Sequence, residues 1–292
     1  MSKEKIYLFD TTLRDGAQTQ GVDFSLNEKE KISKSLDNLG VDYIEGGWPG
    51  ANPTDTEFFN KDQNFKNANL TAFGMTKKSE HSAKNDPMLS SLINSKSSSV
   101  CLFGKSWDFH VDVALGISND QNLENISESA KHIVNSGKEF MFDAEHFFDG
   151  YKSNPEYAIS CLKAAYDSGA RWIVLCDTNG GTLPHEVSKI VEEVTKHIPG
   201  KNLGIHAHND TENAVANSLV AVQAGVRQVQ GTIYGVGERC GNVSLATVLP
   251  NLVLKMNKKT KTKLNLSDLS SIVKFTYDIT VSYTHLRAHE TS

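Results

Sequence analysis

Two histidines one residue apart, His206 and His208, lie at the end of an apolar run in the stretch GIHAHND at residues 204–210. In an extended strand, residues two positions apart project to the same face, so both imidazoles would point the same way. Imidazole nitrogens are frequent ligands of transition metals. An isolated pair of this kind more often marks only the place where a buried strand reaches water. The pair therefore predicts a metal site only if the fold brings further ligands beside it.

The elements that would position this pair follow from the pattern of apolar residues. Short apolar runs alternate along the chain with longer runs whose apolar residues recur every three or four positions, as in amphipathic helices. The strand candidates lie near residues 5–10, 43–47, 70–75, 99–104, 139–145, 172–178, 203–208 and 226–233. Eight such units in 292 residues predict an α/β fold, a single (β/α)8 TIM barrel. A doubly wound open sheet is the competing architecture, but no GxGxxG follows the first strand candidate.

A closed barrel would supply the missing ligands. Active sites of TIM barrels lie at the carboxyl ends of the strands, and closure places the first strand beside the eighth, with the seventh one position further round. Asp15 and Asn242 would then be neighbours of His206 and His208. Two imidazoles, a carboxylate and an amide oxygen suit Zn²⁺, Mn²⁺, Co²⁺ or Mg²⁺. We therefore predict a divalent metal held by Asp15, His206, His208 and Asn242.

Other polar residues at strand ends are candidates for substrate chemistry. Arg14 is permanently charged and could stabilise a developing oxyanion, although a structural ion pair is the alternative. Glu145 could transfer a proton, and a solvated loop carboxylate is nearly as good an interpretation. Gln18 could line the same pocket. Asp10, inside the first strand, is predicted to satisfy buried hydrogen-bonding groups rather than to touch substrate.

Composition excludes several classes of protein. Hydrophobic residues make up 38% and charged residues 22% of the chain, as in globular proteins, and the formal net charge of −5 argues against a dedicated nucleic-acid binder. No apolar run is long enough to span a bilayer, and the N-terminus lacks the apolar segment of a signal peptide. The four cysteines form no CxxC pair. A cytoplasmic protein that binds neither membrane nor nucleic acid is the simplest interpretation.

The chain changes character after about residue 258. We expect residues 1–258 to form the catalytic barrel and 259–281 to form one further helical segment. Residues 282–292 continue no periodic pattern, so they stay unassigned and could be an assembly scar or a foreign extension.

Two stretches carry a resemblance to a known family. DTTLRDGAQT at 10–19 and GIHAHNDTENAVANSLVAVQAGVRQVQGTIYGVGERCGN at 204–242 resemble the paired signatures of the HMG-CoA-lyase-like barrel family. Within it the chain is similar to the alpha-isopropylmalate, homocitrate and citramalate synthases. EGGWPGANPTDTEFF at 45–59 and DAEHFFDGYKSNPEYA at 143–158 look most like the citramalate synthase type. The resemblance covers roughly residues 4–275.

The resemblance implies an acyltransferase that condenses acetyl-CoA with a 2-oxo acid, with pyruvate as the expected acid and citramalate as the product, in isoleucine and leucine biosynthesis. The implied steps are a metal-assisted Claisen condensation and thioester hydrolysis. It implies that Asp15, His206 and His208 bind the metal and that Asn242 completes or adjoins the site. It also implies that Arg14, Glu145 and Thr178 contact the oxo acid, and that the enzyme is a homodimer. A bulky Trp48 would narrow the pocket to the size of pyruvate.

Several alternatives stay open. The chain could be a 2-isopropylmalate or homocitrate synthase, a carbon–carbon lyase or aldolase of the HMG-CoA lyase kind, or a non-catalytic metal-binding barrel. The family's synthases usually continue into a linker subdomain with an FxHKxGxH-like stretch and a regulatory domain, and neither is recognisable here. We therefore expect the chain to be the barrel portion of a longer enzyme.

Overall fold

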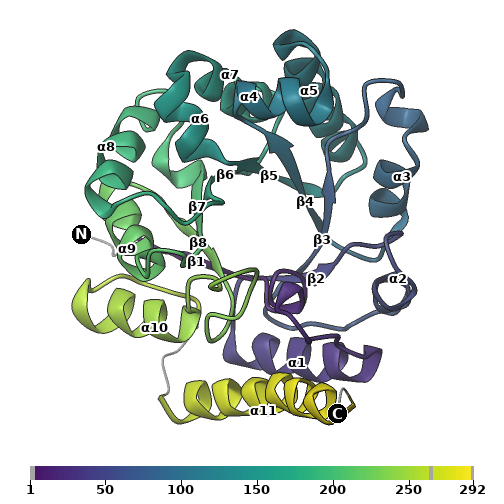
Figure 1. Ribbon diagram of the computed structural model, residues 1–292, viewed down its shortest axis with the longest axis vertical. Coiled ribbons are helices and arrows are strands. Elements are labelled where there is room, and N and C mark those ends of the chain that lie inside the picture. The colour runs from purple at the N-terminus through teal and green to yellow at the C-terminus, as the bar shows by residue number, and fades with distance from the viewer. Residues whose placement is uncertain (1–3, 263–265, 291–292) are drawn as a thin grey trace.

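Eight parallel strands close into a barrel in sequence order in the computed structural model, which describes residues 4–262 and 266–290, with helices packed around the outside (Figure 1). Each strand pairs in parallel with the next, and β1 closes on β8. The predicted TIM barrel is confirmed, and the open sheet is excluded. The strands are β1 (Tyr7–Asp10), β2 (Tyr43–Gly47), β3 (Asn69–Met75), β4 (Ser99–Lys105), β5 (Glu139–Glu145), β6 (Trp172–Asp177), β7 (Leu203–Ala207) and β8 (Gln228–Gly231).

Helices follow the strands along the chain. The α-helices are α1 (Leu26–Leu39), α2 (Pro53–Asn60), α3 (Pro87–Asn94), α4 (Asp108–His110), α5 (Asn119–Asn135), α6 (Phe147–Ser153), α7 (Pro155–Tyr166), α8 (Pro184–Val194), α9 (Ala214–Ala224), α10 (Leu245–Pro250) and α11 (Leu266–Glu290). Short 3-10 or π segments are η1 (Gly16–Gln18), η2 (Ala83–Asn85), η3 (Val111–Leu115), η4 (Gly200–Asn202) and η5 (Asn251–Lys255).

The helices begin and end where the sequence supplies capping residues. At the start of α1, the Ser25 side chain accepts from the Glu28 N–H, and the Glu28 carboxylate accepts from the Ser25 N–H in return. The helix ends at Gly40, whose φ of 87° lies in the left-handed region that favours glycine. At the start of α2, Asn52 caps the helix and Pro53 occupies its first turn.

The core has two apolar parts. The larger lies between the sheet and the helices and includes Leu8, Ile44 and Phe142. The smaller fills the inside of the barrel, where Trp172 donates its indole N–H to the Tyr43 hydroxyl at 3.1 Å. Because aromatic side chains occupy the barrel at the amino ends of its strands, space for a ligand is left at the carboxyl ends.

Asp10 has the structural role that its position predicts. Its carboxylate is fully buried and accepts from the N–H of Thr12 at 2.9 Å and from the Thr12 hydroxyl at 3.1 Å. Burial, only partly offset by these two hydrogen bonds, raises the pKa of Asp10 to about 7.

This buried carboxyl predicts a specific dependence of stability on pH. Between the ordinary pKa and the raised one, the folded state holds a proton that the unfolded state has lost, so stability falls as pH rises through this range. In Asp10→Asn the amide oxygen can still accept from Thr12, but the titration is gone. From pH 5 to pH 8, we expect the wild-type free energy of unfolding to fall by about 2 kcal/mol more than that of the variant. Urea unfolding at both pH values measures this difference, and equal changes in the two proteins would contradict it.

The helix after the barrel is longer than the sequence indicates. α11 lies alongside α1 on the outside of the barrel (Figure 1) and runs from Leu266 to Glu290 as one element. The segment 282–290, left unassigned from the sequence, continues this helix, and residues 291–292 lie outside the described residues. The division at 258 and 281 stays a prediction.

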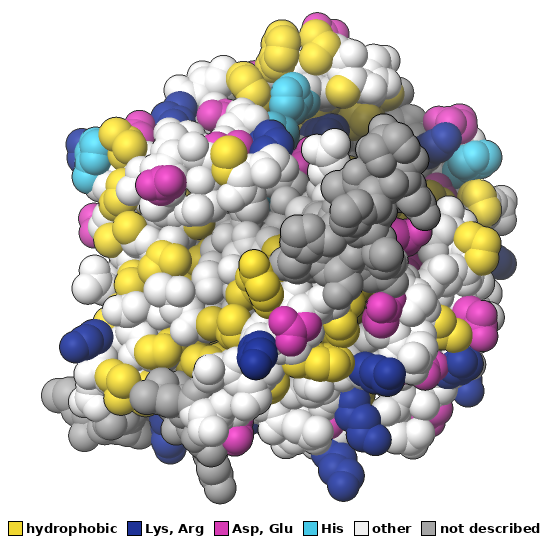
Figure 2. Space-filling view, turned by 60° about the horizontal axis from the view of Figure 1, so that its bottom comes forward, with side chains coloured by type: hydrophobic (Ala, Val, Ile, Leu, Met, Phe, Trp, Pro, Cys, Tyr) yellow, Lys and Arg dark blue, Asp and Glu magenta, His cyan; other side chains and the backbone are white. Residues whose placement is uncertain are grey.

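Within residues 4–262 and 266–290, no helix combines the length and the apolar character needed to cross a bilayer. On the face shown in Figure 2, acidic, basic and hydrophobic side chains are interspersed over the described part of the surface.

Candidate metal and substrate site

A cavity of about 680 Å³ opens among the residues that follow the strand ends. It brings together residues that are far apart in the sequence. Of the site residues predicted from the sequence, the lining includes Arg14, Asp15, Gln18, Glu145, Thr178, His206 and His208. Asn242 is not among the lining residues, but it forms a strand-like bridge with His208.

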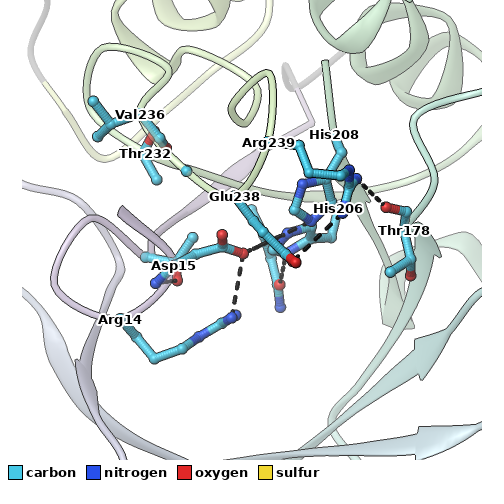
Figure 3. Close-up of polar contacts among 12 residues, drawn as sticks. Arg14, Asp15, Thr178, His206, His208, Thr232, Val236, Glu238 and Arg239 are labelled. Atoms are coloured by element: carbon cyan, nitrogen blue, oxygen red, sulfur yellow. Dashed lines mark hydrogen bonds and ion pairs between the residues drawn. The ribbon is translucent and has the colours of Figure 1, made fainter. Parts of the chain in front are cut away.

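Three potential metal ligands converge at this cavity. Oδ2 of Asp15 lies 3.2 Å from Nε2 of His206 and 3.9 Å from Nε2 of His208. One ligand atom from each residue lies within 4.8 Å of the other two, and all three side chains are buried. Figure 3 shows these side chains and Arg14 pointing toward one another. We call Asp15, His206 and His208 the triad.

The triad fits a divalent cation. Oδ1 of Asp15 is buried without a hydrogen-bond partner, and so are both polar atoms of the Asn242 amide. Buried polar groups normally have partners, because leaving one unsatisfied costs about 1–3 kcal/mol. A cation bound by the triad would satisfy the carboxylate. Asn242 is bridged to His208 through the backbone, and its part in the site stays a prediction.

Electrostatics keeps two triad members ready to bind. Burial would raise the pKa of Asp15, but the Arg14 guanidinium and the two histidines hold it well below the usual range. Burial, with a further contribution from His206, lowers the pKa of His208 to about 4. Burial also opposes charge on His206, but the hydrogen bond and charge of Asp15 raise the pKa of that imidazole. At neutral pH, Asp15 is therefore ionised and His208 is neutral, the forms that bind a metal.

Arg14 is held in a fixed orientation beside the triad. Its Nε donates to Oε2 of the buried Glu45 at 2.7 Å, and its Nη1 lies 3.2 Å from Oδ2 of Asp15. The guanidinium carbon lies 3.9 Å from the centre of the Phe73 ring. Thr11 donates its hydroxyl to the same Glu45 oxygen at 2.5 Å. Arg14 therefore forms buried ion pairs and also lines the cavity, and its role toward a substrate stays a prediction.

Thr178 and Glu145 occupy the opposite side of the cavity. The Thr178 hydroxyl oxygen accepts from the His146 N–H at 2.8 Å, which leaves its hydrogen free to donate into the cavity. Above it, Arg239 donates to the Thr178 carbonyl oxygen at 2.6 Å (Figure 3). Glu145 forms an ion pair with Lys105, which fixes the position of its carboxylate as a hydrogen-bond acceptor.

Three aromatic rings form one wall of the cavity. The rings of Phe73 and Phe103 stack at 5.5 Å, and Trp48 meets them edge-on at 5.7 and 6.0 Å. The backbone N–H of Trp48 donates to Asp55 at 2.8 Å, which fixes the loop that carries the indole. We call Trp48, Phe73 and Phe103 the aromatic wall.

Four residues of the site could not be identified from the sequence, namely Glu45, Lys105, Phe73 and Phe103. Each lies in a strand, where single polar or aromatic residues are common. The residue that each one contacts is on another strand and cannot be read from the local sequence. The one available signal was the charged residue inside the short run YIEGG, which a fully apolar strand would lack.

Comparison with known proteins agrees with the fold and the motifs. The HMGL-like family model matches residues 5–276. The chain is 53% identical over 278 residues to an (R)-citramalate synthase of Aquifex aeolicus, covering 94% of this chain and 53% of that protein. It is 49% identical over 276 residues to an (R)-citramalate synthase of Geobacter sulfurreducens, covering 94% and 52%. A 2-isopropylmalate synthase of Shouchella clausii is 36% identical over 270 residues, covering 91% and 51%. The chain thus spans about half the length of these curated relatives.

Solved structures agree on the fold. The crystal structure of the HMG-CoA lyase of Bacillus subtilis superposes with a TM-score of 0.81 at 20% identity, covering 96% of this chain and 95% of that one. At this identity the match supports the barrel architecture alone.

Proposed function

Because the chain belongs to the HMGL-like family, we propose that it condenses acetyl-CoA with a small 2-oxo acid, pyruvate, to give citramalate. The observation that carries the proposal is the buried triad beside a fixed Arg14, in a cavity that the aromatic wall also lines. The identities of 44–53% to (R)-citramalate synthases, against 32–36% to 2-isopropylmalate synthases, favour pyruvate as the oxo acid.

The reaction would form one carbon–carbon bond and break one thioester. The acetyl methyl group loses a proton and its carbon bonds to the ketone carbon of pyruvate, whose oxygen becomes an alkoxide and is then protonated. Water next hydrolyses the thioester and releases the thiol of CoA. A divalent cation held by Asp15, His206 and His208, with Asn242 adjoining, would supply Lewis-acid polarisation of the ketone.

The chain's own residues have distinct proposed roles. Arg14 stabilises the negative charge that develops on the ketone oxygen, because Glu45 and Asp15 fix its guanidinium before substrate arrives. Thr178 donates its free hydroxyl hydrogen to the substrate carboxylate, and Gln18 contributes to the same lining. Glu145, held by Lys105 and lining the cavity, is the proposed acceptor of a proton from the acetyl group.

The test is 2-oxo-acid-dependent release of CoA thiol from acetyl-CoA. We expect release with pyruvate to exceed release with 2-oxoisovalerate or 2-oxoglutarate, to require a divalent cation, and to yield citramalate. Calorimetric titration with pyruvate, with and without chelator, separates binding from turnover. The proposal fails if the chain neither binds a 2-oxo acid in the presence of metal nor releases thiol.

The aromatic wall predicts a specific change in substrate preference. In Phe103→Ala the wall loses one of its two stacked rings, which makes room for a larger substrate side chain. We expect the ratio of kcat/KM for 2-oxoisovalerate to that for pyruvate to rise by about tenfold or more, as expected when a pocket gains space for extra methyl groups. Thiol release with each acid measures the ratio.

Phe109→Ala is the matched control, because Phe109 is exposed on α4 and does not line the cavity. An unchanged ratio in a folded Phe103→Ala variant would exclude the aromatic wall as the determinant of substrate size.

A further inference from the structure

A buried polar chain runs from the triad into the barrel interior. His206 and Gln230 are register partners on the neighbouring strands β7 and β8, so their side chains lie next to each other. Nδ1 of His206 lies 2.8 Å from Oε1 of Gln230. The Gln230 amide nitrogen then donates across the barrel to Oδ1 of Asp143 on β5, at 3.1 Å. All three side chains are buried.

The surroundings of Gln230 fix which way its amide points. Its nitrogen faces two oxygens, Oδ1 of Asp143 at 3.1 Å and Oε1 of Gln228 at 3.5 Å. A flipped amide would place its own oxygen against the ionised Asp143 carboxylate, which is repulsive. With Asp143 ionised, the amide oxygen of Gln230 therefore faces His206.

This orientation determines where the His206 proton lies. An amide oxygen only accepts, so Nδ1 of His206 carries a hydrogen, and a cation bound beside Asp15 would take the lone pair of Nε2. Nε2 is the nitrogen that faces Asp15. His208 has no such partner, because its Nδ1 is buried without a hydrogen bond. The two histidines of the triad are thus not equivalent.

We propose that Gln230, oriented by Asp143, is a positioning residue that selects the Nδ1–H tautomer of His206 and thereby sets the affinity of the triad for a divalent cation. The inference rests on the proposed function insofar as the triad binds a metal. Hydrogen bonds to the second nitrogen of a metal-binding histidine fix the ring and increase its basicity. Gln230 is therefore expected to act on metal affinity, although it is not itself a ligand.

The first test replaces the acceptor by a side chain of similar length. In Gln230→Met, His206 loses its partner, and we expect the dissociation constant for Zn²⁺ or Mn²⁺ to rise by about 10- to 100-fold, the usual effect of removing such a partner. Calorimetric titration of the metal-free protein measures it. Gln63→Met is the matched control, because the half-buried Gln63 donates to the Phe58 carbonyl oxygen and contacts neither His206 nor Gln230; we expect a change below about threefold.

A double variant tests the direction of the hydrogen bonds. In Asp143→Asn with Gln230→Glu, the amide at position 143 can donate to the new carboxylate, which still accepts from His206. The net charge is unchanged. We expect the metal affinity of this double variant to lie within about threefold of wild type, unlike the weakened affinity expected for Gln230→Met. Weak binding by the folded double variant would overturn the proposed orientation.

A spectroscopic readout requires no variant that could fail to fold. With ¹⁵N-labelled histidine, His206 of the Zn²⁺-bound wild type should show a protonated Nδ1 and an unprotonated, metal-bound Nε2. A ring protonated at Nε2 would overturn the inference. If the wild type binds no metal in calorimetry, the proposed function fails; if it binds metal and Gln230→Met binds equally well, only this inference fails.

Discussion

His208→Ala is expected to weaken divalent-cation binding by more than about 100-fold, beyond the loss seen when only a hydrogen-bond partner of a ligand is removed. The side chain faces Asp15 at 3.9 Å, and its Nδ1 has no hydrogen-bond partner, so its removal breaks few other contacts. Its pKa of about 4 means that the ring is neutral at pH 7 and that the variant loses no charge there. Calorimetric titration with Zn²⁺ and Mn²⁺ measures the affinity, and pyruvate-dependent thiol release should fall with it.

The matched control is His185→Ala. His185 is an exposed residue of α8 and does not line the cavity. We expect this variant to keep wild-type affinity and thiol release. Wild-type metal affinity in His208→Ala would remove the triad as the metal site, and with it the basis of the proposed function.

The barrel and the triad could be predicted from the sequence because both depend on simple patterns. The alternation of short and long apolar runs fixes the order of strands and helices, and closure of the barrel follows from their number. In the closed barrel, only β8 separates β7 from β1, so Asp15 after β1 lies near the histidine pair of β7. The assignment required no knowledge of any side-chain conformation.

Contacts between polar residues inside the strands could not be predicted in this way. Gln230 reaches Asp143 across the barrel, and Glu45 meets Arg14 at the end of a neighbouring strand. Both contacts depend on register and on the depth of each residue in the barrel, and a shift of one residue would turn either side chain outward. The length of α11 was missed for another reason, since residues 282–290 show no periodic apolar pattern by which a helix could be recognised.

The fixed orientation of Arg14 leads to the second large expected effect. Arg14→Lys keeps the positive charge beside Glu45. A neutral residue would leave the buried Glu45 carboxylate unpaired, which typically lowers the free energy of unfolding by about 3–5 kcal/mol. A loss of activity in such a variant could not be separated from a loss of stability. A lysine ammonium cannot replace the planar fork that meets Glu45 through Nε and Asp15 through Nη1. We therefore expect kcat/KM for pyruvate to fall by about 100- to 1,000-fold, as when one donor to a developing oxyanion is lost. Metal affinity should change by less than about tenfold, because Arg14 is not a ligand.

Arg227→Lys is the control for this variant. Arg227 also pairs with a carboxylate, that of Glu4, but it lies at the amino end of β8, away from the cavity. Retention of wild-type kcat/KM by a folded Arg14→Lys variant would show that Arg14 has only the structural role of pairing with Glu45.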